Sequence, residues 1–528
     1  MTINRKFPRT SGVLMPITTL HGPFGIGVLG TEAMEFIDFL CAAGFHAWQI
    51  LPVEHTGMCN SPYKCISAFA GEPNLIDPRM LLEMGLINET ELTERLDGMN
   101  DAFVEYENVR SKHWKLLQTA FSRCRNQSET NSKPYKDFNP FWLDEYTLFI
   151  SLKRHFDYEA WFKWPDKGLR SHDKETLDNY RKQLSEEIEF HKFVQWLFDL
   201  QWNKLRSYAN ERGISLIGDM PIYVSEDSAE VWSRRELFDA DEDGNFKAVG
   251  GCPPDYFTPD GQHWGNPIYN WELLKEENYE WWINRLRASL DRYDVVRLDH
   301  FRGFESYWRI PGDATTARKG KWTKGPGIEL FKTLEKALGD LTLSVIAEDL
   351  GIINENVELL LKDSGFRGMR VLQFGFIGDE LHMPHNIPEE TSAYTGTHDN
   401  TTILAWLFEM SPKDREKALF YIGFDGDWGI GGSSGPAIKQ WIRALFMTSA
   451  SLAVVPIQDM LGYGSDTRIN IPGTPTGNWR FRIRKGVLKE IDIYFYKELH
   501  DTYQREDPVK TFKPRPKEKS PFPEPDPD

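Results

Sequence analysis

The chain contains 528 residues, of which 40% are hydrophobic and 27% charged, which is enough for one large elaborated domain or about three smaller ones. Its formal net charge of −17 repels phosphate backbones and anionic lipid surfaces, so nucleic acid and membranes are disfavoured as partners and a neutral substrate is expected. The five cysteines form no CxxC pair and there is no long apolar stretch, which predicts a reduced, cytoplasmic protein without a disulfide framework or a zinc site.

The first segment of the chain, residues 10–77, is predicted to open an α/β fold. A strand and a glycine loop come first, followed by an amphipathic helix over 31–44 and a second strand over 46–53. Short connections between a strand, a helix and a second strand are typical of such folds. The loop that follows contains the motif NSPYKCISAFAG.

The glycine loop, GIGVLG from Gly25 to Gly30, matches the GxGxxG pattern of dinucleotide-binding folds. Such a loop would hold a pyrophosphate at the N-terminus of the next helix. The segment before it contains Gly22 and Pro23 and does not read as a buried strand, and no strand-ending acid follows at the expected distance. A tight turn that leads into a barrel helix is therefore the favoured interpretation.

Residues 78–200 are predicted to form a mainly helical insertion, because several segments place apolar residues at spacings of three and four. The last of these segments continues as a barrel helix and is followed by a strand over 214–224. Residues 225–275 are rich in glycine, proline, aspartate and aromatic residues and lack periodicity. Loops of this length in compact domains are usually functional or disordered, and the aromatic content favours a substrate-binding loop subdomain.

From residue 276 onward, helical segments alternate with strand-like segments, which predicts parallel strands. The strand-like segments are DVVRLDH, LSVIAED, MRVLQFGF, THDN and SLAVVPIQDML. Residues 1–505 are therefore predicted to form a single catalytic domain. The segment 506–528 consists largely of prolines and charged residues and is expected to be a flexible tail.

Three acidic residues, Asp299, Glu348 and Asp399, each close one of these strand-like segments. If the strands lie in one parallel barrel, the carboxylates meet at its C-terminal face, where barrel enzymes place their chemistry. Strand alternation puts Arg297 on the same face as Asp299, so we expect the guanidinium to keep Asp299 ionised as a nucleophile. Asp349 follows Glu348, and its charge is expected to raise the pKa of Glu348 toward that of a general acid.

Two carboxylates in different environments are what retaining glycoside chemistry requires, and Asp399, beside His398, would hold sugar hydroxyls. Barrel enzymes that bind Mg²⁺ and abstract a proton also use three strand-end carboxylates. Their ligands come from successive strands, whereas a whole additional unit separates Glu348 from Asp399. Arg297 and His300 beside the first acid also fit a metal site poorly, so metal binding stays a minor alternative.

Two loops supply the predicted substrate surface. The first presents Tyr63 after a serine and a proline. The second, GGCPPDYFTPDGQHWGNPIYNW, presents Asp255, Phe257, Gln262 and Trp264 on a backbone that prolines make rigid. Aromatic side chains beside amide and carboxylate groups suit a carbohydrate site.

In these motifs the chain resembles the 4-α-glucanotransferases, the amylomaltase or disproportionating-enzyme family of the α-amylase superfamily. The resemblance runs from about residue 10 to 500 and includes WQILPV, SPYKCISAFAG, GDMPIYV, CPPDYFTPDGQHWGNPIY, VRLDHFRGF, AEDLG, GTHDN and RINIPGTPTGNW. It implies a (β/α)8 TIM barrel with inserted, partly helical subdomains and no separate C-terminal β domain. It also implies no nicotinamide cofactor and no required metal.

The resemblance assigns Asp299 as the nucleophile, Glu348 as the general acid/base and Asp399 as the stabiliser of the transition state. It implies a retaining double displacement that transfers segments of α-1,4-glucan to the 4-hydroxyl of an acceptor glucan or glucose. A hydrolytic amylase-like enzyme is the second hypothesis and a non-catalytic glycan-binding protein the third. The partners would be α-1,4-glucans and maltooligosaccharides, bound by a monomer or homodimer. The implied substrate contacts are Tyr63, Asp219, Asp255, Phe257, Trp264, Arg297, His398 and Asn470.

Overall fold

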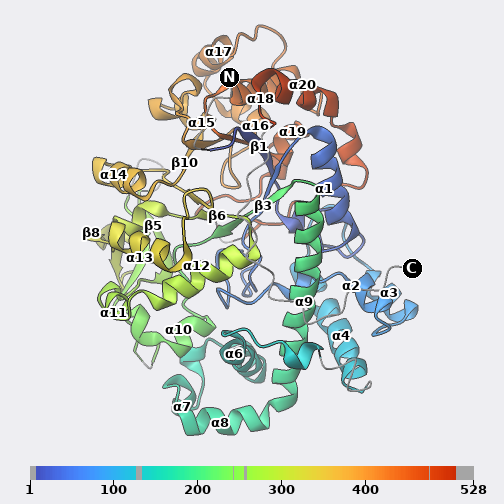
Figure 1. Cartoon of the computed structure of the whole chain (residues 1–528), viewed down its shortest axis with the longest axis vertical. Coiled ribbons are helices and arrows are strands. Elements are labelled where there is room, and N and C mark those ends of the chain that lie inside the picture. The colour runs from blue at the N-terminus through green and yellow to red at the C-terminus, as the bar shows by residue number, and fades with distance from the viewer. Residues whose placement is uncertain (1–6, 127–133, 242, 255–258, 475, 507–528) are drawn as a thin grey trace.

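The computed structural model describes residues 7–126, 134–241, 243–254, 259–474 and 476–506 (Figure 1). Eight strands form one parallel sheet in the order β10-β11-β12-β1-β2-β3-β6-β9. A parallel bridge between Ile346 and Arg367 joins the two ends of this order, so the sheet closes into a barrel and the predicted (β/α)8 fold is confirmed. The strands are β1 (Thr10–Leu14), β2 (Ala47–Gln49), β3 (Ser215–Met220), β6 (Val295–Leu298), β9 (Val345–Ala347), β10 (Gly368–Val371), β11 (Thr391–Tyr394) and β12 (Leu452–Pro456).

Both faces of the barrel strands are buried, so apolar side chains occur on both of them. Successive side chains of a strand point to opposite faces. Ile217, Val295 and Ile346 belong to a cluster inside the barrel, which also contains Leu14, Met369, Tyr394 and Leu452. Their neighbours Leu216, Val296 and Val345 pack outward in the main core between the barrel and its helices.

The glycine loop GIGVLG leads directly into α1, the helix after β1. Helix α1 begins directly after Gly30, and Gly44 ends it in the left-handed conformation with φ 88°. Ile26 and Val28, inside the GIGVLG motif, are buried in a small cluster with Val104. The motif is thus a packed turn that leads into a barrel helix. The other helices along the barrel wall include α9 (Ser185–Glu211), α12 (Glu280–Arg292), α13 (Ile328–Leu338) and α14 (Glu355–Ser364), and α1 itself spans Thr31–Ala43.

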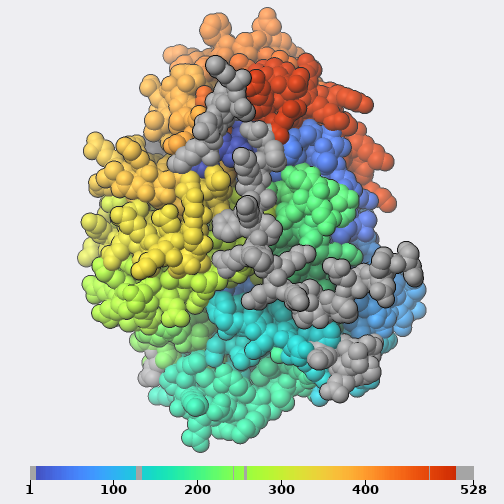
Figure 2. Space-filling view, viewed as in Figure 1, coloured from blue at the N-terminus to red at the C-terminus, as the bar shows by residue number. Residues whose placement is uncertain are grey.

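Helices fill the region between β2 and β3, where the sequence predicts a helical insertion. They are α2 (Pro78–Glu83), α3 (Glu89–Leu96), α4 (Tyr106–Arg125), α6 (Leu143–His155), α7 (Lys167–Arg170) and α8 (Lys174–Gln183). Figures 1 and 2 show α6, α7 and α8 gathered at the lower end of the molecule, opposite the C-terminal helices. Helix α9, about 40 Å long at 27 residues, runs from this end to the barrel.

A second sheet lies where the sequence predicts loops. Its four antiparallel strands follow the order β5-β4-β7-β8, with bounds β4 (Ala248–Cys252), β5 (Gln262–Pro267), β7 (Ser306–Pro311) and β8 (Lys321–Lys324). Two short helices, α10 (Ala229–Ser233) and α11 (Trp271–Glu276), accompany it. The expectation of a long loop over 225–275 is corrected, because this segment contains the strands β4 and β5 and the helices α10 and α11. The strand sequences AVGGC and QHWGNP contain glycine and proline, so their local propensity is low and pairing in the sheet stabilises them.

The C-terminal part of the barrel differs from the prediction in two details. The expected strand MRVLQFGF ends at Val371 and continues as the short helix α15 (Leu372–Gly375), and THDN follows β11 instead of forming a strand. The remaining helices are α16 (Ile403–Glu409), α17 (Pro412–Tyr421), α18 (Pro436–Met447), α19 (Ile457–Met460) and α20 (Ile493–Tyr503).

None of the helices in the described ranges is long and apolar enough to cross a membrane. Residues 507–528 of the expected flexible tail lie outside the described residues. The division of the chain into a single catalytic domain with two inserted subdomains stays a prediction.

Candidate active site

Three charged side chains, Asp219, Arg297 and Asp299, lie together at the C-terminal end of the barrel interior. Asp219 and Arg297 each lie two residues beyond a side chain of the inner cluster, and they are direct partners in the register of β3 and β6. The Nη1 atom of Arg297 lies 2.8 Å from both Asp219 carboxylate oxygens and 3.0 Å from Asp299 Oδ1. Burial alone would lower the pKa of Arg297, but the two carboxylates raise it well above its usual value. The predicted proximity of Arg297 to Asp299 is confirmed.

Asp299 and Glu348 directly follow neighbouring strands of the barrel. Asp299 comes after β6, its N–H donates to the Met220 carbonyl, and its side chain is 25% exposed. Glu348 comes after β9 and is buried. Glu348 Oε2 accepts from the N–H of His300 at 2.7 Å, and Oε1 accepts from the N–H of Leu350 at 2.9 Å. Two backbone donors therefore fix the orientation of the Glu348 carboxyl group.

The pKa of Glu348 is raised, as the sequence predicts, but the predicted cause is wrong. Burial raises the pKa to about 8; Arg297 opposes this rise and Asp299 adds to it. Asp349 is not among the main causes of this rise, since successive residues point to opposite sides of the extended chain. Its carboxylate instead pairs with Arg370, with Nη1 and Oδ2 2.8 Å apart. Glu348 is therefore protonated at neutral pH while a second carboxyl group lies nearby.

Asp399 lies in the loop between β11 and α16 and not at the end of the strand itself. Its side chain is nearly half exposed. Asn470 Nδ2 donates to Asp399 Oδ1 at 2.6 Å, and His398 Nε2 lies 3.4 Å from the same oxygen. Arg468 Nη2 donates to the backbone carbonyl of Asp399 at 2.5 Å. Residues from the segment after β12 thus hold the acid in place.

Tyr63 connects the Asp219–Arg297 pair with the loop that carries His398 and Asp399. Its Oη donates to Asp219 Oδ2 at 2.7 Å and lies 2.9 Å from His398 Nε2. The ring of Trp479 packs against Tyr63 and His398, with centroids 5.8 and 6.0 Å apart. The structure therefore brings together Tyr63, Asp219, Arg297, Asp299, His398, Asp399 and Asn470, with Glu348 on the strand beside Asp299.

Trp264, on β5 of the second sheet, lies beside this group. Its ring meets the ring of His300 edge-on, with centroids 4.9 Å apart, and its Nε1 donates to Gln262 at 3.0 Å. Burial lowers the pKa of His300 to about 4, so this ring is neutral at neutral pH. The predicted contacts Asp255 and Phe257 lie outside the described residues.

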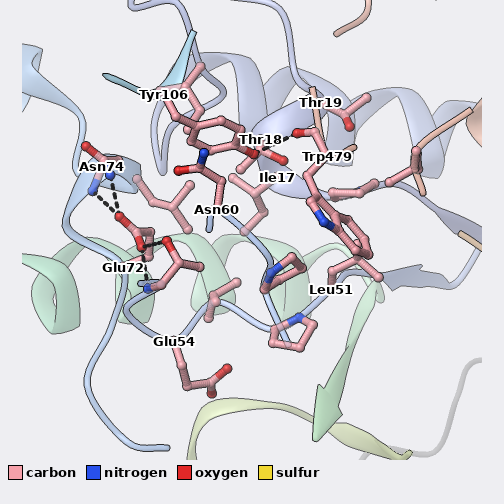
Figure 3. Close-up of a pocket in the computed structure, with 18 of the residues that line it drawn as sticks. Ile17, Thr18, Thr19, Leu51, Glu54, Asn60, Glu72, Asn74, Tyr106 and Trp479 are labelled. Atoms are coloured by element: carbon pink, nitrogen blue, oxygen red, sulfur yellow. Dashed lines mark hydrogen bonds between the residues drawn. The ribbon is translucent and has the colours of Figure 1, made fainter. Parts of the chain in front are cut away.

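Trp479 also lines a pocket that sequence reasoning did not find (Figure 3). The pocket and the open solvent at its mouth together make up about 590 Å³ of empty space. Ile17 and Leu51 contribute apolar walls, and Asn60 contributes an amide. Tyr106 Oη donates to the Trp479 carbonyl at 2.7 Å, so the start of α4 supports the tryptophan. The only sequence signal for Trp479 was its place in the motif RINIPGTPTGNW.

The described residues contain no group of three or more His, Cys, Asp or Glu side chains arranged to hold a metal ion. The polar groups of the site are instead paired with one another. A protonated carboxyl group, a carboxylate beside a guanidinium and aromatic faces can together perform acid-assisted displacement at a sugar carbon.

Comparison with known proteins identifies the class of this site. The family model for 4-alpha-glucanotransferase matches residues 15–488. The chain belongs to the 4-alpha-glucanotransferase family. A 4-alpha-glucanotransferase of Thermus thermophilus is 42% identical to it over 492 residues, covering 92% of this chain and 96% of that protein. A 4-alpha-glucanotransferase of Streptococcus pneumoniae is 40% identical over 485 residues, covering 91% and 94%.

Solved structures agree with this 4-alpha-glucanotransferase assignment. The amylomaltase from Streptococcus agalactiae, determined in complex with acarbose, aligns with a TM-score of 0.90 and 40% identity, covering 94% of this chain and 99% of that one. The predicted enzyme class is confirmed. The roles of individual residues in this 4-alpha-glucanotransferase stay predictions.

Proposed function

We propose that this 4-alpha-glucanotransferase uses Asp299 as its nucleophile, Glu348 as its general acid/base and Asp399 to stabilise the transition state. The observation that carries the proposal is the environment of Glu348, a buried carboxyl group with a pKa of about 8 beside Asp299. Neutral and charged carboxyl groups side by side are the pair that retaining glycoside chemistry needs.

In the first displacement, the Glu348 carboxyl group donates its proton to the glycosidic oxygen while an Asp299 oxygen attacks C1. The bond between C1 and the protonated glycosidic oxygen breaks, the shortened glucan leaves, and a β-glucosyl ester of Asp299 remains. Arg297 Nη1 lies 3.0 Å from Asp299 Oδ1, so the guanidinium contacts the carboxylate that attacks. Asp219 still balances the charge of Arg297 once Asp299 is esterified.

In the second displacement, the Glu348 carboxylate removes the proton from the 4-hydroxyl of an acceptor glucan or glucose. The acceptor oxygen attacks C1 and the Asp299 carboxylate leaves, so two inversions give net retention. Transfer exceeds hydrolysis only if water is kept away from the β-glucosyl ester. The site must also hold the acceptor 4-hydroxyl close to C1, so that it attacks faster than water does.

The proposed substrates are α-1,4-glucans and maltooligosaccharides, and a related amylomaltase has been determined with acarbose. Aromatic faces and charged hydrogen-bonding groups around the acids suit the two sides of a sugar ring. We assign the chain to the cytoplasm as a monomer or homodimer. The proposed contacts are Tyr63, Asp219, Trp264, Arg297, His398 and Asn470, together with Asp255 and Phe257.

The test is a product profile from maltotriose alone. Wild-type protein is expected to yield glucose together with maltopentaose and longer chains, whereas glucose and maltose without longer products would identify a hydrolase. Asp299→Ala is expected to lower kcat by several orders of magnitude while acarbose binding persists. The matched control is Asp313→Ala, which removes an exposed aspartate and is expected to leave kcat unchanged. An Asp299→Ala enzyme with normal kcat would refute the assignment.

A further inference from the structure

One buried carboxylate, Asp459, holds both ends of the loop over 396–402, which connects β11 to α16. Thr395, just before this loop, donates through Oγ1 to Asp459 Oδ2 at 2.6 Å. Ile403, just after it, donates through its N–H to Asp459 Oδ1 at 2.7 Å. Asp459 belongs to α19, after β12, so the next unit of the barrel fixes the span of the loop.

The burial of Asp459 makes these two hydrogen bonds important. Asp459 is 2% exposed as a whole residue, and a buried carboxylate is costly unless donors surround it. Burial raises the pKa of Asp459 to about 6, and the hydrogen bonds from Thr395 and Ile403 oppose this rise. A buried acceptor with one short bond on each oxygen defines where its two donors lie.

Other contacts fix the middle of the loop, where His398 and Asp399 lie. The N–H of Asn470 donates to the carbonyl of His398 at 3.1 Å, and Arg468 donates to the carbonyl of Asp399 at 2.5 Å. Asn400 Oδ1 accepts from the Thr397 N–H at 2.9 Å within the loop. The centre of the loop is therefore attached to segment 468–470, and its two ends are attached to Asp459.

We propose that Asp459 is a positioning residue for glucan transfer, which acts by fixing the loop that presents His398 and Asp399 to the sugar. This inference rests on the proposed role of Asp399 in the transition state. An interaction realised mainly in the transition state changes kcat more than KM when it is displaced. A displacement of about 1 Å at a reacting centre lowers the rate by about 100-fold.

Asp459→Ala is therefore expected to lower kcat for maltotriose disproportionation by about 10- to 100-fold, with KM within about threefold of wild type. Asp459→Asn is expected to recover most of the lost kcat. Its Oδ1 can accept from the Ile403 N–H, and its amide can donate to the Thr395 hydroxyl, which both donates and accepts.

The matched control is Asp294→Ala. Asp294 is also buried and accepts from the Leu216 N–H at 2.8 Å and from Arg206 Nη2 at 2.9 Å. It precedes β6, at the end of the strand opposite Asp299. We expect Asp294→Ala to lower the denaturation midpoint while kcat per folded molecule stays within twofold of wild type.

The inference is overturned if kcat per folded molecule is as high in Asp459→Ala as in Asp294→Ala, or if Asp459→Asn recovers none of the loss. If Asp459→Ala does not fold, Thr395→Val replaces it and removes one of the two donors. A kcat several-fold below wild type with unchanged KM then supports the inference, and an unchanged kcat overturns it. A fully active Asp299→Ala enzyme would instead refute the proposed function, whatever the Asp459 variants do.

Discussion

The free energy of unfolding of a Glu348→Gln variant, compared with that of wild type, should become larger as the pH rises. The pKa of Glu348 is about 8 in the folded protein, whereas the ordinary pKa of a glutamate, which applies to the unfolded chain, is 4.5. The folded protein therefore binds this proton more tightly than the unfolded chain between these two values. The stabilising contribution is fully present below about pH 4.5 and is lost as the pH rises toward 8. Glutamine carries no titrating proton, so the variant keeps its stability over this range.

The size of this pH-dependent stability difference follows from the shift in the pKa of Glu348. Between pH 5 and pH 8, each pH unit lowers the free energy of unfolding of wild type by about 1.4 kcal/mol relative to the variant, so the difference between them grows by about 3 to 4 kcal/mol. The glutamine amide faces one of the two N–H donors, His300 or Leu350, which costs about 1 to 3 kcal/mol. That cost does not depend on pH, so the slope is the decisive quantity.

Urea unfolding followed by circular dichroism at pH 5, 6, 7 and 8 measures this slope. Glu94→Gln is the matched control, because it makes the same substitution at an exposed position, where the ion pair with Lys115 is 3.6 Å long and contributes little to stability. A difference between Glu348→Gln and wild type that stays constant within about 0.5 kcal/mol over this range would refute the reasoning, because one pKa unit corresponds to about 1.4 kcal/mol. Glu348 would then ionise as an ordinary carboxyl group.

The same pKa predicts that kcat/KM falls above about pH 8, as the acid loses its proton; a profile that stays level to pH 10 would contradict the role of Glu348. Tyr63→Phe removes the hydroxyl that contacts Asp219 and His398 but keeps the ring, so we expect kcat/KM to fall about tenfold with an unchanged thermal midpoint. Trp479→Ala removes the ring that supports Tyr63 and His398, and maltotriose kinetics should show a higher KM; an unchanged KM would exclude Trp479 from the substrate surface.

The barrel could be predicted because its strands and helices carry strong local signals. Strands such as β12 are apolar runs bounded by polar or glycine residues, and helices such as α9 repeat apolar residues at helical spacing. The second sheet could not be predicted in this way. Strands β4 and β5 are rich in glycine and polar residues, and hydrogen bonds to neighbours distant in sequence stabilise them.

The residues of the site also differ in how far the sequence predicts their position. Arg297, Asp299 and Glu348 occupy strand ends, where alternation and barrel geometry fix their position before the structure is known. Trp479 and Asp459 hold the site through contacts between separate loops, which sequence spacing does not encode. Adjacency in sequence was misleading for Asp349, whose charge lies beside Glu348 in the chain but pairs with Arg370 instead.

The contact between Tyr63 and Trp479 bears on how the protein is made. These two rings come from opposite ends of the chain, and the N–H of Val104 donates to the carbonyl of Arg480 close by. During synthesis, the strand that carries Asp299 leaves the ribosome long before Trp479 is translated. The nascent chain can thus contain Asp299, the proposed nucleophile, while it still lacks the Trp479 ring that packs against Tyr63 and His398. We therefore expect a chain truncated before Trp479 to lack the ring that packs against Tyr63 and His398.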